Sequence, residues 1–420
     1  AIIQLNPSTV GFELDLESML AVADLERTRQ PFWSAFWNFL WGSTGELINV
    51  PLIFNYSEER LRTYLAEELA SRYDRAPTPS MPVAGTTSFQ QGSPGTSLDI
   101  DRSVLLIEAA LQSPGKRVVD LPLQRTTPSR PSIQNLEILL RQTIDSEQFN
   151  GMTGLYLLDL QTAQEINFLY DQGVNLPTQP ETAFNAINVI KIPIMVSVFK
   201  RLGENPDPEV VSLIEEMIVK SGNTPADRLM EELVHETYGP LEVTNDMRSL
   251  GFQNTFLAGY FFLGAPLLET FHTPANQNSD RTDSSAPLSQ TTTSEIGMLM
   301  ADIYQCAQNG GGALIAAFPG EITQAECQTM MKYLSGGQIS ILIQAGVPEG
   351  TTVAHKHGWV QDAFGVIHDM SDAGIVFTPG GTYVLSIFLY HPEQLVWDNA
   401  SKLVSDLSKA VYNYYNVPQP

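Results

Sequence analysis

The sequence predicts an α+β protein with two domains, a small α+β domain at residues 1–127 and a larger domain at residues 131–420 in which helices flank an antiparallel sheet and form a helical lobe. Its 420 residues exceed what one ordinary hydrophobic core holds. Residues 126–132 are rich in Thr, Pro and Ser, a composition typical of a domain boundary. Beyond it, strand patterns lie on both sides of a mostly helical middle, which predicts a split sheet with a helical insertion.

The N-terminal domain contains short strand patterns followed by acidic caps and helices. Residues 76–97 carry four prolines and predict a loop within this domain. The expected strands are 12–15, 97–101 and 118–123, and the expected helices are 16–24, 58–73 and 103–111. Over roughly residues 8–127 this arrangement resembles the peptidoglycan-binding domain attached to several cell-wall enzymes, and the resemblance implies peptidoglycan as a partner.

An aromatic segment at residues 32–41 contains three tryptophans spaced four residues apart. Its apolar residues recur at spacings of three and four, which predicts a helix with two adjacent apolar faces. We favour a helix buried on most sides in the core of a small domain. The alternative is an aromatic face that contacts glycan rings, a membrane or a partner. The residues concerned are Phe32, Trp33, Phe36, Trp37, Phe39, Leu40 and Trp41.

The composition excludes several classes of partner. A net charge of −24 argues against nucleic acid and anionic lipid, because phosphate binding needs clustered Lys and Arg. No apolar run reaches the roughly 18 residues of a membrane span. Because the chain starts at Ala1 without an initiator Met, we expect a processed form that has lost a signal or anchor.

Cys306 and Cys327 are the only cysteines and form no CxxC, so we expect no metal and no cofactor. A disulfide between them and two buried thiols both remain open.

The larger domain begins with a helix and ends with one. Residues 154–160 and 165–170 alternate as two strands of a hairpin, and a mostly helical stretch follows from 183 to 335. Strands then return, and the last two are joined by the Gly pair at 380 and 381. The remaining expected elements are helices at 133–144 and 399–415 and strands at 338–345, 352–360, 373–378 and 382–390.

The chemistry is concentrated at the start of the helical stretch, where Asn188 precedes Lys191 by three residues and Ile-Pro follows. Residues three apart share a helical face, so a lysine amine reaches the side chain one turn before it. A helix N-terminus also supplies free N–H groups for an oxyanion. Class A β-lactamases and other penicillin-recognising serine hydrolases carry Ser-x-x-Lys here, and residues 131–420 resemble that family. The resemblance implies the class A β-lactamase fold, with Asn188 at the nucleophile position. A carboxamide has no useful nucleophilic atom, so the family's acyl-enzyme chemistry should be absent.

Two later motifs support the resemblance. Ser221-Gly-Asn223 matches the Ser-x-Asn of the family, in which the serine relays a proton and the asparagine holds the substrate amide. Lys356-His357-Gly358 matches Lys-(Thr/Ser)-Gly in its outer residues, and these positions bind the substrate carboxylate in the family. His357 replaces the hydroxyl, and its charge depends on pH. The resemblance therefore implies a cleft that binds peptidoglycan stems or a β-lactam-like small molecule.

The deacylating glutamate of class A enzymes has only a weak counterpart. Residues 267–284 are the corresponding loop, and Glu269 is its one glutamate. We interpret it primarily as a surface residue and secondarily as a water-activating group. Asn276 and the cluster at residues 281–283 are expected to shape this loop instead.

Other motifs are given structural interpretations. Ser197 and Lys200 form a literal Ser-x-x-Lys further along the same helix, which we expect to be part of the core. His355 should face away from Lys356 because strand side chains alternate. His368 and Asp369 are adjacent, so they should not point together as a catalytic dyad. The remaining histidines considered, His235 and His272, read as surface residues.

Three functions remain open. The first is a catalytically impaired, extracytoplasmic protein, secreted or associated with the cell envelope, that binds a cell-wall ligand without covalent turnover; Asn188 and His357 motivate it. The second is an active β-lactamase or D,D-peptidase lineage in which Asn188 is an engineered or local exception, since Lys191, Ser221 and Lys356 remain. The third is an adhesion or scaffold protein that uses the aromatic N-terminal helix.

Overall fold

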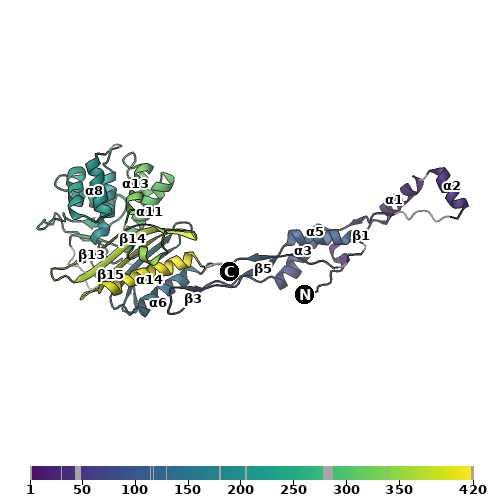
Figure 1. The fold of residues 1–420 in the computed structure, drawn as a ribbon, viewed down its shortest axis with the longest axis horizontal. Coiled ribbons are helices and arrows are strands. Elements are labelled where there is room, and N and C mark those ends of the chain that lie inside the picture. Colours follow the sequence, from purple (N-terminus) through teal and green to yellow (C-terminus); the bar gives the residue numbers. More distant parts are fainter. Residues whose placement is uncertain are drawn as a thin grey trace. The chain divides into compact units, whose positions relative to one another are not determined.

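The computed structural model describes residues 2–29, 31–42, 49–113, 115–116, 118–128, 130–178, 181–203, 206–277, 287–337 and 339–417 (Figure 1). The chain divides into two compact units. The first comprises Ala1–Pro79 and Gly92–Ser129, and the second comprises Ser80–Gln91 and Arg130–Pro418. Each unit has its own hydrophobic core.

The first unit is a small α+β assembly. Asp15 and Asp99 cap their helices by accepting the backbone N–H groups of Ser18 and Arg102. Its elements are a 3₁₀ turn Pro7–Val10, β1 (Glu13–Leu14), α1 (Leu16–Thr28), α2 (Phe32–Leu40), β2 (Phe54–Asn55), α3 (Glu58–Tyr64) with its π-helical continuation Leu65–Ala70, α4 (Ser71–Tyr73), β5 (Gly95–Leu98), α5 (Ile100–Leu111) and β6 (Leu123–Thr126). β1 pairs with β2, and β5 with β6, both antiparallel.

Two expectations for this unit were wrong. The strand expected at 118–123 begins only at Leu123, because its pairing partner β5 ends at Leu98, opposite Leu123. The aromatic helix α2 exists but has no buried residue, so the favoured interpretation of a core helix is incorrect. The unit's small core forms between the 3₁₀ turn, α3 with its continuation, and α5, and neither α1 nor α2 contributes a buried side chain.

The second unit is built on a six-stranded antiparallel sheet in the order β13-β14-β15-β7-β8-β9 (Figure 1). Its strands are β7 (Met152–Asp159), β8 (Glu165–Asp171), β9 (Val174–Leu176), β13 (Thr352–Gln361), β14 (Ile367–Thr378) and β15 (Gly381–Tyr390). The helices α6 (Ile133–Ser146) and α14 (Trp397–Tyr415) cover one face, while the helical lobe covers the other. Alternate side chains of β15 enter the two cores, which is why this central strand is apolar from Tyr383 to Leu389 except at the buried Ser386.

The helical lobe contains most of the predicted helical stretch. Its helices are α7 (Lys191–Phe199), α8 (Pro208–Ile218), α9 (Asn223–Leu229) with its π-helical continuation Met230–Val234, α10 (Gly239–Ser249), α11 (Thr293–Asn309), α12 (Ala313–Ala317) and α13 (Gln324–Leu334). A small sheet, β10 (Phe184–Asn185), β12 (Ser289–Thr291) and β11 (Phe256–Leu257), lies within this stretch. No helix of the described residues is long and apolar enough to cross a membrane.

Residues 76–97 are not simply a loop of the N-terminal domain. Ser80–Gln91 belongs to the second unit, where β3 (Met81–Pro82) and β4 (Phe89–Gln90) form a hairpin. Phe89 is buried with its ring 6.1 Å from that of Tyr414 on α14. The buried Phe89 therefore attaches residues 80–91 to the hydrophobic core of the second unit.

The strand expected at 338–345 was also wrong. Gln338 lies outside the described residues, and residues 339–345 form turns that lead into the 3₁₀ helix Gln344–Gly346. Leu342 has a left-handed φ of 51°, and the backbone of Ile343 is bonded by the side chains of Asp372 and Ser408. Leu342 and Ile343 are buried by packing while Ile339 is exposed, and the backbone of Ile343 is held by side chains instead of by a neighbouring strand.

Cys306 on α11 and Cys327 on α13 form a disulfide, with Cα atoms 5.8 Å apart and a sequence separation of 21. Closing a loop of this size lowers the entropy of the unfolded chain and contributes about 3 kcal/mol to stability.

We expect reduction of the Cys306–Cys327 disulfide to lower the free energy of unfolding by about 3 kcal/mol in a urea titration. A Cys306→Ala/Cys327→Ala variant should be equally destabilised and insensitive to reductant. Equal midpoints for the unmodified chain with and without reductant would contradict this.

Candidate functional site

Asn188 lies in a 3₁₀ turn, Ile187–Ile190, which runs directly into α7. The residue before it, Ile187, has a left-handed φ of 49°, which is unfavourable for a β-branched side chain. The Ile187 N–H donates to Asn185 Oδ1 at 3.2 Å, so the turn is held by local hydrogen bonding. Backbone strain of this kind is typical of functional sites, where the surrounding structure maintains it.

Lys191 is buried beneath Asn188, and its ammonium group donates to three oxygens. The acceptors are Asn188 Oδ1 at 2.6 Å, the Ser221 carbonyl at 2.7 Å and Asn223 Oδ1 at 2.7 Å. An ammonium group has three N–H donors, so these contacts use all of them. The first two motifs of the sequence therefore meet at one nitrogen atom.

Ser221 connects this cluster to the sheet. It lies between α8 and α9 with a left-handed φ of 57°, and its Oγ accepts a hydrogen bond from Lys356 Nζ on β13. Lys356 Nζ also donates to the carbonyl of His357 at 3.0 Å. The third motif thus reaches the second through a lysine–serine contact, and residues from three distant parts of the chain form one site.

Gly358 is required by close packing against Asn188. A Cβ at position 358 would lie 2.8 Å from both the Cβ and the backbone nitrogen of Asn188. Carbon atoms do not approach this closely without a shift of the backbone. A glycine on β13 therefore lets the Asn188 turn lie directly against the edge strand.

The site is cationic and lacks a bonded counter-ion. Burial, followed by repulsion from Lys356, lowers the pKa of Lys191 to about 7. Burial lowers the pKa of Lys356 to about 8. Among the described residues, no carboxylate accepts a hydrogen bond from either ammonium group; Asp227 and Asp372 act on them only through space. Both ammonium groups are therefore positively charged below these pKa values.

His357 lies apart from the other motif residues. Its ring stacks on Trp359 with centroids 5.7 Å apart and lies 5.4 Å from His355, both of which alternate with Lys356 along β13. Its Nδ1 is buried without a hydrogen-bond partner, and burial lowers its pKa to about 4. At neutral pH His357 is therefore uncharged and does not add to the positive charge of the two lysines.

Glu269, the candidate for water activation, is exposed, and no hydrogen bond to its side chain is found in the described part of the chain. The ring that faces the lysine belongs to Phe261, which precedes residues 267–284 and whose centroid lies 5.5 Å from Lys191 Nζ. The Phe261 N–H donates to Asp227 Oδ1 at 2.8 Å, which fixes this preceding segment to α9. Sequence reasoning missed both residues, because a Phe in a loop and an Asp on a helix match no catalytic pattern.

The rest of the loop is organised by Asn276. Its side chain accepts the Thr273 N–H at 2.9 Å and donates to the Phe271 carbonyl and to Gln290 Oε1, both at 3.0 Å. The cluster at residues 281–283 lies outside the described residues. Asn276 thus ties the described end of the loop to β12.

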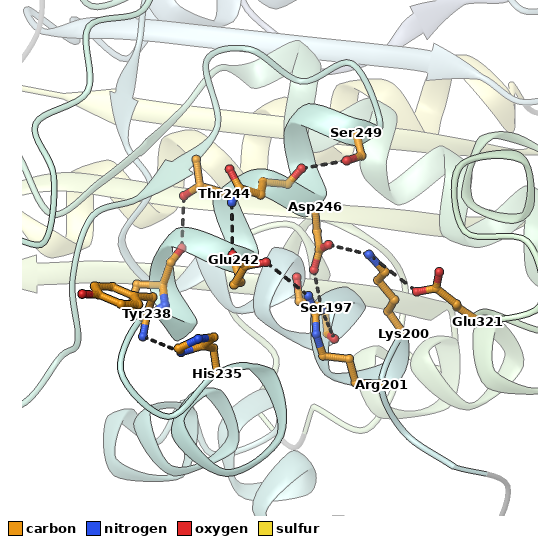
Figure 2. Close-up of polar contacts among 12 residues, drawn as sticks. Ser197, Lys200, Arg201, His235, Tyr238, Glu242, Thr244, Asp246, Ser249 and Glu321 are labelled. Atoms are coloured by element: carbon orange, nitrogen blue, oxygen red, sulfur yellow. Dashed lines mark hydrogen bonds and ion pairs between the residues drawn. The ribbon is translucent and has the colours of Figure 1, made fainter.

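The literal Ser-x-x-Lys of α7 is a structural feature (Figure 2). Lys200 Nζ donates to Asp246 Oδ1 at 2.8 Å, and Arg201 donates to Asp246 Oδ2 at 2.6 Å. The buried Ser197 Oγ has no hydrogen-bond partner. Lys200 therefore serves an ion-pair network within the helical lobe, and the pair has no nucleophile–base contact.

The histidines outside the third motif have other roles. His355 is buried, and its Nδ1 lies 2.9 Å from Asp372 Oδ1, a partner that alternation along the strand did not identify. His368 contacts the His391 carbonyl and Asp362, while Asp369 accepts from Asn185, so the adjacent pair forms no dyad. The two remaining histidines are exposed; they are His235 and His272.

At position 188 the site holds a carboxamide, to which Lys191 donates and whose nitrogen and oxygen are poor nucleophiles at neutral pH. The hydroxyl of the cluster belongs to Ser221, whose Oγ accepts a hydrogen bond from Lys356. Within the described residues, no group of three or more His, Cys, Asp or Glu could hold a metal ion.

Comparisons with known proteins agree with the fold. Residues 204–415, just over half of the chain, match the profile Beta-lactamase2, described as the beta-lactamase enzyme family. That span includes Ser221, Asn223 and Lys356 and begins after Lys191. A comparison with curated proteins finds no match.

Several solved structures are similar to this chain. PBP-A is 19% identical with a TM-score of 0.49, over 70% of this chain and 100% of that chain. A β-lactamase from Desulfarculus baarsii is 18% identical with a TM-score of 0.48, over 67% and 98% of the two chains. A class A β-lactamase representative from Bacteroides cellulosilyticus is 16% identical with a TM-score of 0.47, over 68% and 98%.

Proposed function

Because this chain belongs to the beta-lactamase enzyme family, we propose that it binds a carboxylate-bearing cell-wall ligand, a β-lactam or the D-alanyl end of a peptidoglycan stem, without forming an acyl-enzyme. The observation that carries this proposal is the contact between Lys191 Nζ and Asn188 Oδ1 at 2.6 Å. In place of an oxygen that can be deprotonated, the lysine faces a carboxamide. The two buried lysines supply the attraction for the ligand's carboxylate.

A second candidate function is that of an active lineage with a local exception at Asn188. What favours it is the retained assembly of Lys191, Ser221, Asn223 and Lys356 within hydrogen-bond distance of one another. Under that alternative the unmodified chain would still open a β-lactam ring. The two candidates therefore differ in whether a covalent product is ever formed.

We further propose an extracytoplasmic location, secreted or in the cell envelope. The disulfide between Cys306 and Cys327 supports it, since disulfides persist in oxidising compartments. The resemblance of residues 8–127 to a peptidoglycan-binding domain supports the same location. In this proposal the N-terminal unit holds the ligand-binding unit close to the cell wall.

The test is calorimetric binding of benzylpenicillin and of an acyl-D-Ala-D-Ala peptide, followed by intact mass spectrometry. We expect reversible binding without a mass increase. Since the lysine pKa values are about 7 and about 8, affinity should be full below pH 7 and should fall as the pH rises through both values. His357 titrates near 4 and should not contribute in this range.

A Lys356→Met variant provides the control, because it keeps the length of the side chain and removes one charge. It should bind more weakly and lose the component of the pH dependence near 8. Turnover of a chromogenic β-lactam by the unmodified chain would overturn the proposal in favour of the active lineage. Absence of binding at every pH would overturn it as well.

A further inference from the structure

Within the described residues, the ring contacts of helix α2 in the first unit are contacts of its own aromatic side chains with one another. Phe39 is 87% exposed and Trp41 is 77% exposed, and none of the residues from Phe32 to Leu40 is buried. Phe32 and Trp33 are also largely exposed. So many exposed rings on nine residues need an external apolar environment.

The short length of α2 also indicates that it needs an apolar surface to pack against. Isolated helices shorter than about 12–15 residues are marginal in water, and helices in proteins owe most of their stability to a packed face. Helix α2 has nine residues, its N-cap residue Pro31 supplies no side-chain cap, and it packs no face. We therefore expect α2 to be a stable helix only when another surface covers its apolar side chains.

The distribution of side chains around α2 indicates what kind of surface this is. At 100° per residue, the seven apolar positions from Phe32 to Trp41 form a continuous arc of about 200°. A helix that docks into a protein groove needs only about half of this width. The remaining side is small and uncharged, formed by Ser34, Ala35 and Asn38.

The segment also lacks charge. Between Arg29 and Glu46 no residue is ionisable, a stretch of sixteen residues. Trp33, Trp37 and Trp41 recur at every fourth position, so they run from the middle of the apolar arc to one of its edges. Tryptophan combines a large apolar ring with one polar N–H, which suits the boundary between lipid headgroups and acyl chains.

We propose that α2 inserts into the interfacial region of a lipid bilayer with neutral headgroups. Its nine residues rise about 14 Å, which is too short to span a hydrocarbon core of about 30 Å. The helix therefore lies in the surface of the bilayer and does not cross it. The net charge of −24 repels an anionic surface, so uncharged or zwitterionic headgroups are the matching partner. This inference is independent of the proposed function.

The experiment is flotation of the full chain with phosphatidylcholine vesicles, combined with tryptophan emission. Binding should shift the emission of the α2 tryptophans to shorter wavelength, and lipids brominated near the headgroup should quench it. Replacing part of the lipid by phosphatidylglycerol should weaken binding at low salt, and added salt should restore it. Trp359 and Trp397, whose rings lie 4.5 Å apart in the second unit, give a constant background.

Variants localise the effect. A Phe39→Ser/Trp41→Ser variant removes two exposed rings and no buried contact, so vesicle affinity should fall by roughly 100-fold, about 10-fold for each ring. The matched control is Leu263→Ser/Phe364→Ser, which removes two equally exposed apolar side chains from the second unit and should leave vesicle binding unchanged. Thermal unfolding of both variants verifies that they are folded.

Three results would overturn the proposal. One is failure of the unmodified chain to float with phosphatidylcholine vesicles. Another is concentration-dependent dimerisation in sedimentation that the Phe39→Ser/Trp41→Ser variant abolishes, because a second copy would then cover α2. The last is binding to lipid-free peptidoglycan that depends on the same two rings.

Discussion

An Asn188→Ser variant should form a covalent adduct with a fluorescent penicillin, while the unmodified chain should form none. The Lys191 amine already lies one hydrogen bond from the side chain at position 188, and its pKa of about 7 leaves it largely neutral at mildly alkaline pH. A neutral amine can accept the proton of a serine hydroxyl. Loss of the nucleophile in another serine hydrolase lowers turnover by on the order of 10⁶, so restoring it should change labelling from undetectable to complete.

The pH dependence of this labelling should have the opposite sign to that of ligand binding. Labelling of Asn188→Ser should increase as the pH rises through about 7, because Lys191 must lose its proton to act as a base. Binding to the unmodified chain needs the protonated lysines and should weaken over the same range. Intact mass and gel fluorescence measure the adduct.

The adduct should also persist. The ring that faces Lys191 belongs to Phe261, and it cannot activate a water molecule for deacylation. Glu269, the glutamate of residues 267–284, is exposed. An Asn188→Ser/Lys191→Met variant is the control and should not label, because the base is gone. Absence of labelling in Asn188→Ser itself would mean that the site has changed beyond its nucleophile, and labelling of the unmodified chain would contradict the role assigned to Asn188.

The fold class of residues 131–420 was predicted correctly from the sequence. The structure brings Lys191, Ser221 and Lys356 together, a proximity that the family resemblance implied and that the spacing within each motif could not give. Asp227 and Phe261 could not be identified, because they act through a backbone N–H and a ring face that belong to no motif. The partner of His355 was hidden for a similar reason, since Asp372 lies on a neighbouring strand.

The wrongly predicted elements have a common physical origin: whether their residues are buried depends on tertiary packing, which local composition does not show. Within residues 339–345 only Leu342 and Ile343 are buried, and this segment belongs to no strand. The first half of β14 was missed because Ser371 and Asp372 are polar yet fully buried at the centre of the sheet. Helix α2 was assigned to a core because its aromatic content is typical of one. Its periodicity predicted the helix correctly but could not show what covers it.

An Asp246→Ala substitution, outside the candidate site, should strongly lower the free energy of unfolding. Asp246 is buried on α10 and holds both Lys200, at 2.8 Å, and Arg201, at 2.6 Å (Figure 2). Removing one member of a buried ion pair leaves a charge without compensation and typically lowers stability by about 3–5 kcal/mol. Lys200 and Arg201 would keep their longer contacts with Glu321, at 3.6 Å, and Glu242, at 3.8 Å, so we expect a loss at the lower end of this range, about 3 kcal/mol, measured by urea denaturation.

The comparison for this effect is an exposed pair in the same lobe. Arg228 and Glu232 on the surface of α9 and its continuation lie 2.9 Å apart, and a Glu232→Ala substitution should lower stability by no more than about 1 kcal/mol. If Asp246→Ala were no more destabilising than Glu232→Ala, the network would not support the lobe. A larger loss of stability for Asp246→Ala would mean that Lys200, the lysine of the literal Ser-x-x-Lys, stabilises the fold through its ion pair with Asp246. Lys200 would then support α7, the helix that begins at Lys191 and follows the turn containing Asn188.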